Sequence, residues 1–468
     1  MNGKTFKTAG LVLLALLLNP AEREIVAEDN QPDEERPNIV LIMADDLGWK
    51  DLHCYGNDKL DTPNLDRLAE QGILFTNAYS ASPVCTPTRA ALMTGESPAR
   101  LNITNHAPGH AEGFSLGVKS EPWQRNLPLD RVTLAEQLRA ADYATGFVGK
   151  WHLSHQPDRD SEFSEEDLRP QHQGFDFNFG GCRFGGPPSY FAPYKNPEAA
   201  DGPDGEYLAD RSADECIRFA KENRDRNFFL CWWNYSVHYP FQAPQELIDK
   251  YEGRPGEGNE NPTYSAMIEG MDQSIGKLIK GLEELDLLDN TIVIFTSDNG
   301  PFAANVKPLR AEKGHLYEGG IRVPLIVRWP GKLNAGTKLD TPVITMDLHA
   351  TILDATGLKP DSSNTPDGLS LVETVTKQVP PRREAIYFHY PNYAFHKKNL
   401  PGAAIRAGRH KLIRRFGEHP IELYDLQADI GEQNNLAETM PDLRDQMLEQ
   451  LNLWLETTGA RIPQAVKD

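Results

Sequence analysis

The chain has 468 residues and a formal net charge of −20 at neutral pH, with 48 Lys and Arg against 68 Asp and Glu. Its 39% hydrophobic and 25% charged residues are typical of a folded globular protein and exclude disordered, fibrous and multispanning membrane classes. The acidic excess excludes the broad basic surface that nucleic-acid binding requires, so we expect no nucleic-acid partner. An anionic substrate would therefore need a local pocket of cations.

The first residues have the pattern of an export signal. Lys4 and Lys7 precede an apolar run over residues 9–18, which is too short to span a bilayer. We expect a cleaved signal peptide over residues 1–27, a linker over 28–36, a periplasmic or secreted protein, and no stable membrane span. A membrane anchor is the alternative interpretation of the same run.

The five cysteines leave one unpaired even if the other four form disulfide bonds. They are Cys54, Cys85, Cys182, Cys216 and Cys231. No CxxC pair is present, so neither a zinc knuckle nor a thioredoxin-like site is indicated. One cysteine needs another explanation.

Continuous apolar runs alternate along the chain with segments of helical periodicity. Runs without polar alternation are typical of strands buried on both faces of a parallel sheet. We predict strands at residues 38–43, 143–148, 228–233, 291–295 and 323–329, and helices at 132–141, 212–222, 263–288 and 346–356. The sequence therefore predicts an α/β fold with a large, mostly parallel sheet flanked by helices.

A stretch rich in proline and arginine at residues 380–383 separates the last part of the chain. Beyond it we predict short strands near Ile386, Ile405, Leu412 and Leu423, and a terminal helix over residues 440–456. We expect a large domain over residues 37–379 and a small C-terminal α+β domain over 380–468. Two long glycine- and proline-rich connections, 180–203 and 253–262, are expected to shape a site.

Ionisable and amide side chains follow four of the predicted strands where these strands end. They are Asp45 and Asp46, then Lys150 and His152, then His238, and finally Asp298 and Asn299. Because the carboxyl ends of parallel strands line one crevice, we expect these side chains to converge. The oxygen ligands among them favour a cation such as calcium or magnesium over zinc or copper. A single Asp-Asp pair would ordinarily be a solvated loop or helix cap, but two pairs at two strand ends favour the metal.

Cys85 is predicted at the amino-terminal end of a short helix, since Pro87 suits a first helical position and Gly95 suits the residue past the end. Free amide hydrogens there favour an anion, and Arg89 adds a forked charge suited to sulfate or phosphate oxygens. An ordinary buried or disulfide-bonded cysteine is the alternative.

The segment from Cys85 to Arg89, Cys-Thr-Pro-Thr-Arg, resembles the signature of the arylsulfatase-like type I sulfatases of the alkaline phosphatase superfamily. In that family the cysteine of Cys-x-Pro-x-Arg is oxidised to formylglycine. Further blocks resemble the family in the expected order: residues 37–48, 149–152, 297–300, 313–324 and 422–426. Ordered blocks with long spacings are far more specific than one short motif. The resemblance runs from about residue 37 to the end and makes the large domain the catalytic one.

The resemblance implies one Ca²⁺ ion and a formylglycine derived from Cys85. The implied calcium ligands are Asp45, Asp46, Asp298, Asn299 and the modified Cys85. Arg89 and Lys150 would orient the formylglycine and stabilise charge, and Lys150 would also contact the sulfate.

Three further residues take catalytic roles by the same resemblance. His152 would serve the modified nucleophile, Lys313 would contact sulfate, and His238 and Lys313 would face the leaving-group oxygen. In the implied reaction a hydroxyl of the hydrated aldehyde attacks sulfur and forms a covalent sulfate ester. A base, for which we favour His152, then deprotonates the other hydroxyl so that sulfate is expelled.

The chain departs from the family pattern at three positions. Thr88 stands where serine is common and keeps the hydroxyl. His53 and Ser154 stand where the family often has glycine, which makes substrate preference harder to transfer. Four other histidines are candidates for the substrate pocket without assigned roles: His106, His110, His155 and His389.

These patterns predict a sulfuric ester hydrolase that cleaves sulfate monoesters of a small molecule or glycan, with a sulfated carbohydrate as the expected substrate. A formylglycine-generating enzyme is the expected partner during maturation. Two alternatives stay open at this stage. One is a phosphomonoester or phosphonate hydrolase with the same pocket, and the other is a non-catalytic protein that binds sulfated glycans through an unmodified Cys85.

Overall fold

The computed structural model describes residues 36–109, 117–156, 163–394 and 399–466. The expected signal peptide and all of the linker except residue 36 lie outside these ranges, as does His110. From Arg36 onward the chain forms one compact unit.

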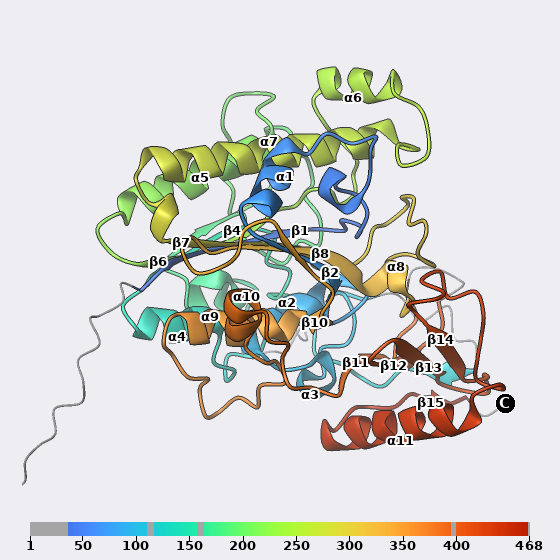
Figure 1. Ribbon diagram of the computed structural model, residues 1–468. Coiled ribbons are helices and arrows are strands. Elements are labelled where there is room, and N and C mark those ends of the chain that lie inside the picture. Colours follow the sequence, from blue (N-terminus) through green and yellow to red (C-terminus); the bar gives the residue numbers. More distant parts are fainter. Residues whose placement is uncertain (1–35, 110–116, 157–162, 395–398, 467–468) are drawn as a thin grey trace, which may run out of the picture. The chain divides into compact units, whose positions relative to one another are not determined.

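A nine-stranded sheet lies at the centre of the described residues (Figure 1). Its strands are β1 (Asn38–Ala44), β2 (Ile73–Tyr79), β4 (Ala144–Gly149), β5 (Phe177–Phe179), β6 (Phe228–Trp233), β7 (Thr291–Ser297), β8 (Arg322–Arg328), β9 (Thr337–Leu339) and β10 (Val343–Ile344). The order is β10-β2-β8-β7-β1-β6-β4-β5, with β9 pairing with β2. Within this sheet β8 alone is antiparallel to its neighbours, β2 and β7. The predicted mostly parallel sheet is confirmed.

Helices cover both faces of this sheet, which explains why its strands are apolar on both sides. Above it in Figure 1 lie α1 (Pro63–Glu70), α5 (Leu208–Glu222), α6 (Gln245–Glu252) and α7 (Pro262–Glu284). Below it lie α2 (Cys85–Thr94), α4 (Leu134–Ala140), α9 (Thr345–Ala355) and α10 (Val372–Lys377). Along β1, Val40 and Ile42 join one hydrophobic core while Ile39 and Leu41 join the other.

The five predicted strands and four predicted helices are present, with end points shifted by a few residues. The largest shifts, of four residues each, are at the start of α5 and at the end of α7. Helix α7 ends at Glu284 because the chain then turns into a short 3-10 helix, Leu288–Asn290. Sequence reasoning missed β2, whose polar Thr76 and Asn77 coincide with an irregularity in its pairing with β8. It also missed the short strands β5, β9 and β10.

The four short strands predicted near the C-terminus form a separate antiparallel sheet. They are β11 (Ala385–Tyr390), β12 (Gly402–Ala407), β13 (His410–Arg415) and β14 (Glu422–Asp425), in that order. One face packs against the terminal helix α11 (Pro441–Thr457) through Met447 and Leu451. The other face packs against Tyr79 and Ile321 of the larger part. The boundary near residue 380 therefore falls between two sheets that share a buried interface, and it stays a prediction.

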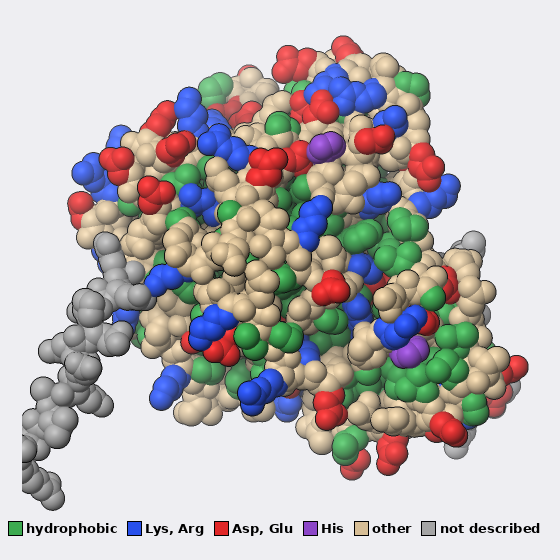
Figure 2. Space-filling model, viewed as in Figure 1, with side chains coloured by type: hydrophobic (Ala, Val, Ile, Leu, Met, Phe, Trp, Pro, Cys, Tyr) green, Lys and Arg blue, Asp and Glu red, His purple; other side chains and the backbone are tan. Residues whose placement is uncertain are grey.

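Short elements complete the described chain. They are α3 (Pro98–Leu101), α8 (Glu318–Ile321), the pair β3 (Val118–Lys119) and β15 (Gln464–Ala465), and 3-10 helices at His53–Tyr55, Glu166–Leu168 and Pro170–His172. On the face drawn in Figure 2, acidic and basic side chains are interspersed over α5, α6 and α7. This mixture is typical of an ordinary solvated surface.

Candidate active site

The predicted site residues meet at the carboxyl ends of four parallel strands, as expected. Asp45 and Asp46 follow β1, and the amide of Asp46 donates a hydrogen bond to Asp298 Oδ1 after β7, at 3.2 Å. The amide of Asp45 donates to the carbonyl of Ser236 after β6, at 2.9 Å. These bonds fasten the ends of neighbouring strands to one another, so their side chains share one edge of the sheet.

Cys85 is the first residue of α2 and is only 1% exposed. The helix begins two residues before the predicted start at Pro87, because a proline anywhere in the first turn costs no hydrogen bond. It ends as predicted at Gly95, whose φ of 75° is left-handed. The thiol Sγ lies 3.8 Å from Asp45 Oδ1, and burial raises its pKa to about 12.

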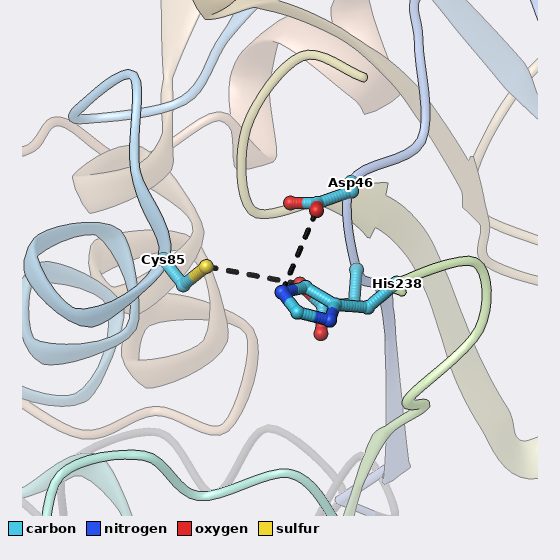
Figure 3. Close-up of side chains that lie close together, drawn as sticks. Asp46, Cys85 and His238 are labelled. Atoms are coloured by element: carbon cyan, nitrogen blue, oxygen red, sulfur yellow. Dashed lines mark hydrogen bonds and ion pairs between the residues drawn. The ribbon is translucent and has the colours of Figure 1, made fainter. Parts of the chain in front are cut away.

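Four potential ligand atoms gather in front of Cys85. One atom from each of Asp45, Asp46, Cys85 and His238 lies within 4.8 Å of the others. Figure 3 shows Asp46, Cys85 and His238 pointing toward a common region from three separate segments of the chain. The sequence indicated all four residues, although it placed His238 beside the leaving group and not among the metal ligands.

Each of the three buried carboxylates has a cation beside it. Lys150 Nζ is 2.7 Å from Asp45 Oδ2, and Lys313 Nζ is 2.5 Å from Asp46 Oδ1. Arg89 makes the corresponding pair with Asp298, at 2.7 Å from Nη2 to Oδ2. These six side chains are at most 5% exposed, so their charges interact through a medium of low polarity.

The three carboxyl groups differ in acidity. Burial raises the pKa of Asp45 to about 8 even though Lys150 opposes the shift. Burial acts the same way on Asp46, but Lys313 overcomes it and holds that pKa below its usual value. Arg89 likewise overcomes burial at Asp298 and lowers its pKa. The site therefore resists holding three negative charges without further positive charge.

The oxygen atoms at this edge fit a hard cation. Asn299 Nδ2 donates to Asp46 Oδ1 at 2.7 Å, so its side-chain amide lies beside this carboxylate. The amide oxygen of Asn299 is buried and has no hydrogen-bond partner among the described residues. A buried carbonyl oxygen without a partner, next to carboxylates, is the donor set that calcium prefers.

The hydrogen bonds of His152 define which ring nitrogen carries the proton. Nε2 lies 2.6 Å from the carbonyl of Ala107, which can only accept, so Nε2 is the donor. Nδ1 is buried and has no hydrogen-bond partner in the described chain. Burial, followed by the charge of Lys150, lowers the pKa of His152 well below its usual value. A free lone pair on a neutral ring is the state that a general base requires.

His238 has the opposite arrangement. Its Nδ1 lies 2.6 Å from the carbonyl of Tyr239 and is therefore the donor, which leaves the Nε2 lone pair facing Asp46 Oδ2 at 3.6 Å. Burial lowers the pKa of His238 to about 3, although Asp46 opposes this shift. Two electron-rich atoms that face each other are stabilised when a cation or a proton lies between them.

Two glycines that sequence reasoning did not assign lie against these histidines. A Cβ on Gly185 would lie 2.8 Å from His152 Nε2, and a Cβ on Gly186 would lie 2.6 Å from His238 Nδ1. Any other residue at these positions would displace the rings. The only indication of these two glycines in the sequence was the glycine-rich connection 180–203, which was expected to shape a site. In the structure this connection lies against both histidines.

The other expectations have mixed outcomes. All five cysteines lie in the described residues and all are free thiols, so none is held in a disulfide bond. His389 lies in the C-terminal sheet, where its Nε2 is 3.1 Å from the carbonyl of Arg461. His106 contacts its neighbour Asn105. His155 lies three residues beyond His152, close to the site.

Comparison with known proteins defines the class. The family model described as Sulfatase matches residues 37–358, and the model described as N-sulphoglucosamine sulphohydrolase, C-terminal, matches residues 311–457. The chain therefore belongs to the sulfatase family, within the alkaline phosphatase superfamily, and is a sulfuric ester hydrolase.

Several relatives cover most of the chain. Human arylsulfatase A is 33% identical and the alignment covers 89% of this chain and 87% of the relative. An N-acetylgalactosamine-6-O-sulfatase of Bacteroides thetaiotaomicron is 30% identical over 91% of this chain and 94% of the relative. Among solved structures, the crystal structure of Ps i-CgsB superposes with a TM-score of 0.77 at 29% identity, covering 90% of this chain and 93% of the other. The same protein has also been solved with k-i-k-neocarrahexaose.

Membership of this family and the sulfatase relatives support hydrolysis of sulfate esters. Within the described residues, we find no helix with the length and apolar character needed to cross a membrane.

Proposed function

We propose that this sulfatase uses Cys85, oxidised to formylglycine, to remove sulfate from a carbohydrate through a covalent sulfate ester at position 85. The observation that carries the proposal is the position of Cys85: its Sγ is buried at the start of α2, 3.8 Å from Asp45 and facing His238. A hydrated aldehyde there would supply one hydroxyl to attack sulfur and a second through which the ester is later resolved.

His152 is the base that resolves the ester. Its Nδ1 has no hydrogen-bond partner in the part of the chain that the structure describes and its Nε2 is held by Ala107, so the lone pair on Nδ1 can take the proton of the second hydroxyl. Thr86, next to Cys85, lies 3.4 Å from the carbonyl of His152 through its own hydroxyl, which keeps the two segments adjacent. Loss of that proton lets the carbonyl re-form and expels sulfate.

Lys150 and Lys313 hold the sulfate, and Lys313 and His238 face the leaving-group oxygen. Both lysines are buried, Lys150 at the end of β4 and Lys313 in the loop between β7 and α8, which suits them to oppose charge that develops on the sulfate oxygens. Lys313, which carries a proton as an ammonium group, delivers it to the departing alcohol, and His238 faces the same oxygen with its Nε2 directed into the site. Arg89 orients residue 85 and stabilises charge.

Asp45, Asp46, Asp298 and Asn299 would hold one calcium ion together with residue 85. When bound, the ion lowers the pKa of the attacking hydroxyl and offsets the charge of the three carboxylates. The buried, unpartnered oxygen of Asn299 supports this assignment.

The substrate is proposed to be a sulfated carbohydrate. Relatives support this class, since one is named an N-acetylgalactosamine-6-O-sulfatase and another was crystallised in complex with k-i-k-neocarrahexaose. We further infer export through the pattern of residues 1–27, and maturation by a formylglycine-generating enzyme.

The variant Cys85→Ser, produced without a modifying enzyme, tests the proposal. Its single hydroxyl can attack sulfur but offers no second proton to His152, so we expect at most one turnover and a stable sulfate ester on position 85 by peptide mass. Sustained turnover by a confirmed serine would contradict the elimination step. Turnover of phenyl sulfate and phenyl phosphate by the active enzyme, compared side by side, distinguishes the sulfatase from the phosphohydrolase alternative.

A further inference from the structure

Two positions that the proposed mechanism does not use, Ser154 and His155, lie beside an exposed arginine. Asn126 and Ser154 form an antiparallel bridge, and in that register Arg125 lies opposite His155. The chain is thus folded so that a segment remote in sequence presents a guanidinium next to the loop that carries His152.

Glu165 brings a second arginine to the same place. Its Oε1 accepts hydrogen bonds from the hydroxyl of Ser154 and from the amide of Arg183, both at 3.1 Å. Its other oxygen is 2.6 Å from Arg169 Nη2, so an ion pair already compensates the negative charge of Glu165. Burial and then the charges of Arg125 and Arg183 lower the pKa of His155.

Neither arginine has a counter-ion among the described residues. Each packs its guanidinium near an aromatic ring, Arg125 on Trp123 and Arg183 on Phe184, at 5.9 Å from the ring centroid in each case. Neither side chain donates a hydrogen bond to, or forms an ion pair with, any described residue. In a chain of charge −20, two neighbouring exposed arginines that no carboxylate of the described ranges pairs with are unexpected.

The segment of Arg183 is joined directly to the active site. The residue before it, Cys182, accepts a hydrogen bond from the amide of His152 at 3.0 Å. The glycine two residues after it, Gly185, lies against the ring of His152. Arg183 therefore lies between two contacts with the proposed base.

Arg125 is connected to the same histidine from another side. Trp123 lies against Gly109, where an added Cβ would be 2.9 Å from the indole ring. Gly109 follows closely on Ala107, whose carbonyl binds His152 Nε2. Because two or three residues span at most about 10 Å, both arginines border the space beside His152.

We propose that Arg125 and Arg183, with His155 between them, form a second anion site for a sulfate or carboxylate on the carbohydrate leaving group. This inference rests on the proposed function and adds that the preferred substrate carries at least two negative charges. Arginine suits the task because its planar fork binds the paired oxygens of either group. The aromatic rings of Trp123 and Phe184 hold the guanidinium planes and limit the entropy lost on binding.

Competition against 4-nitrophenyl sulfate turnover tests the inference. The probes are three galactose disaccharides: one with a single sulfate ester, one with two sulfate esters, and one with a sulfate ester and a uronate carboxylate. Inhibition constants are measured for the wild type, Arg125→Gln, Arg183→Gln and the double variant. The matched control is Arg224→Gln, an exposed arginine in the turn after α5 and before β6.

We expect the doubly charged probes to inhibit the wild type and the control at least about tenfold more strongly than the monosulfate, the gain of one charge-assisted contact. Each single variant should lose most of this advantage, and the double variant all of it. The ratio of inhibition constants is internal to each variant, so a change in basal rate does not affect it.

Three results separate the possibilities. Stronger inhibition than the monosulfate by the disulfate alone, or by the uronate probe alone, supports the site and identifies the anion that it binds. Equal or absent inhibition by all probes in the wild type, or an advantage that persists in the double variant, overturns the inference while leaving the proposed function intact. Absence of 4-nitrophenyl sulfate turnover by the modified wild type would instead contradict the proposed function, and direct calorimetric titration of the three probes then decides on the anion site.

Discussion

Arg89 donates two hydrogen bonds to a single oxygen of Asp298, from Nε at 2.9 Å and from Nη2 at 2.7 Å. Its remaining terminal nitrogen, Nη1, donates to the carbonyl of Lys150 at 2.6 Å. The side chain is fully buried, so the forked charge that the sequence suggested for an anion is already occupied by the protein. Arg89 thus joins the end of β7 to the end of β4, and the proposed sulfate contacts fall to the two lysines.

Replacement of Arg89 by lysine should therefore act on the assembly of the site. Lysine keeps the charge but cannot make the paired hydrogen bonds to Asp298 and the bond to Lys150. We expect Arg89→Lys to lower kcat/KM roughly 100-fold, the effect of losing about 3 kcal/mol of charge-assisted hydrogen bonding. Steady-state kinetics check this, with Arg224→Lys as the control. Activity within about twofold of the wild type would show that the fork is dispensable.

Removal of the metal should expose the repulsion between Asp45, Asp46 and Asp298. Without a cation, burial disfavours three charged carboxylates, so chelation should abolish turnover and lower Tm by several degrees. Calcium should restore both, and Asn299→Leu should need more calcium for the same recovery. Thermal scans with chelator and with calcium-saturated chelator provide the comparison. Full activity in a chelated, metal-free preparation would exclude the calcium site.

Lys411 should be a large contributor to stability at the interface between the two sheets. Its Nζ lies 3.0 Å from Glu318 Oε1 and 2.9 Å from Glu432 Oε1, and all three groups are fully buried. Lys411→Met would leave Glu432 without a cation among the described residues and Glu318 with Arg322 as its remaining ion-pair partner, at 3.2 Å, so we expect a loss of about 3 to 5 kcal/mol in the free energy of unfolding. Urea unfolding measures it, with the exposed Lys377→Met as the control. Adding Glu432→Gln to Lys411→Met should recover part of the lost free energy of unfolding. An equal loss in Lys411→Met and in the control Lys377→Met would contradict this account.

His349 should make the protein less stable in mild acid. Its ring is buried, Nδ1 lies 3.2 Å from the carbonyl of Leu92, and burial lowers its pKa to about 4. Because the unfolded chain then binds more protons between about pH 6.5 and 4, the free energy of unfolding should fall as pH falls through that range. The loss should reach about 3 kcal/mol relative to His349→Gln. If the free energy of unfolding changed with pH in the same way in the wild type and in His349→Gln, this effect of His349 would be excluded. The surface variant His419→Gln serves as the control.

The sequence predicted the position of the site well because the rule behind it is topological. Asp45, Asp46, Asp298 and Asn299 follow buried strands, and the carboxyl ends of parallel strands must meet. The same rule could not show that Arg89 forms an ion pair with Asp298, since the two residues are 209 apart in the sequence and their pairing depends on side-chain packing.

Contacts between loops were also beyond prediction. The free Nδ1 of His152 follows from a bond to Ala107, and the close approach of Gly185 follows from a long connection without regular periodicity. Strand β2 was missed because an irregular pairing breaks its apolar pattern, although it leads directly to the helix of Cys85. Sequence patterns thus indicated which residues meet, and the structure was needed to show how each side chain is used.

The central claim is that Cys85 becomes an aldehyde and that only this form turns over sulfate esters. The most direct measurement is peptide mass spectrometry of residue 85 in preparations made with and without a formylglycine-generating enzyme, together with 4-nitrophenyl sulfate turnover of each. We predict that the specific activity rises in proportion to the fraction of peptide carrying formylglycine and extrapolates to zero without it. Full activity in a preparation whose residue 85 is entirely unmodified cysteine would contradict the account.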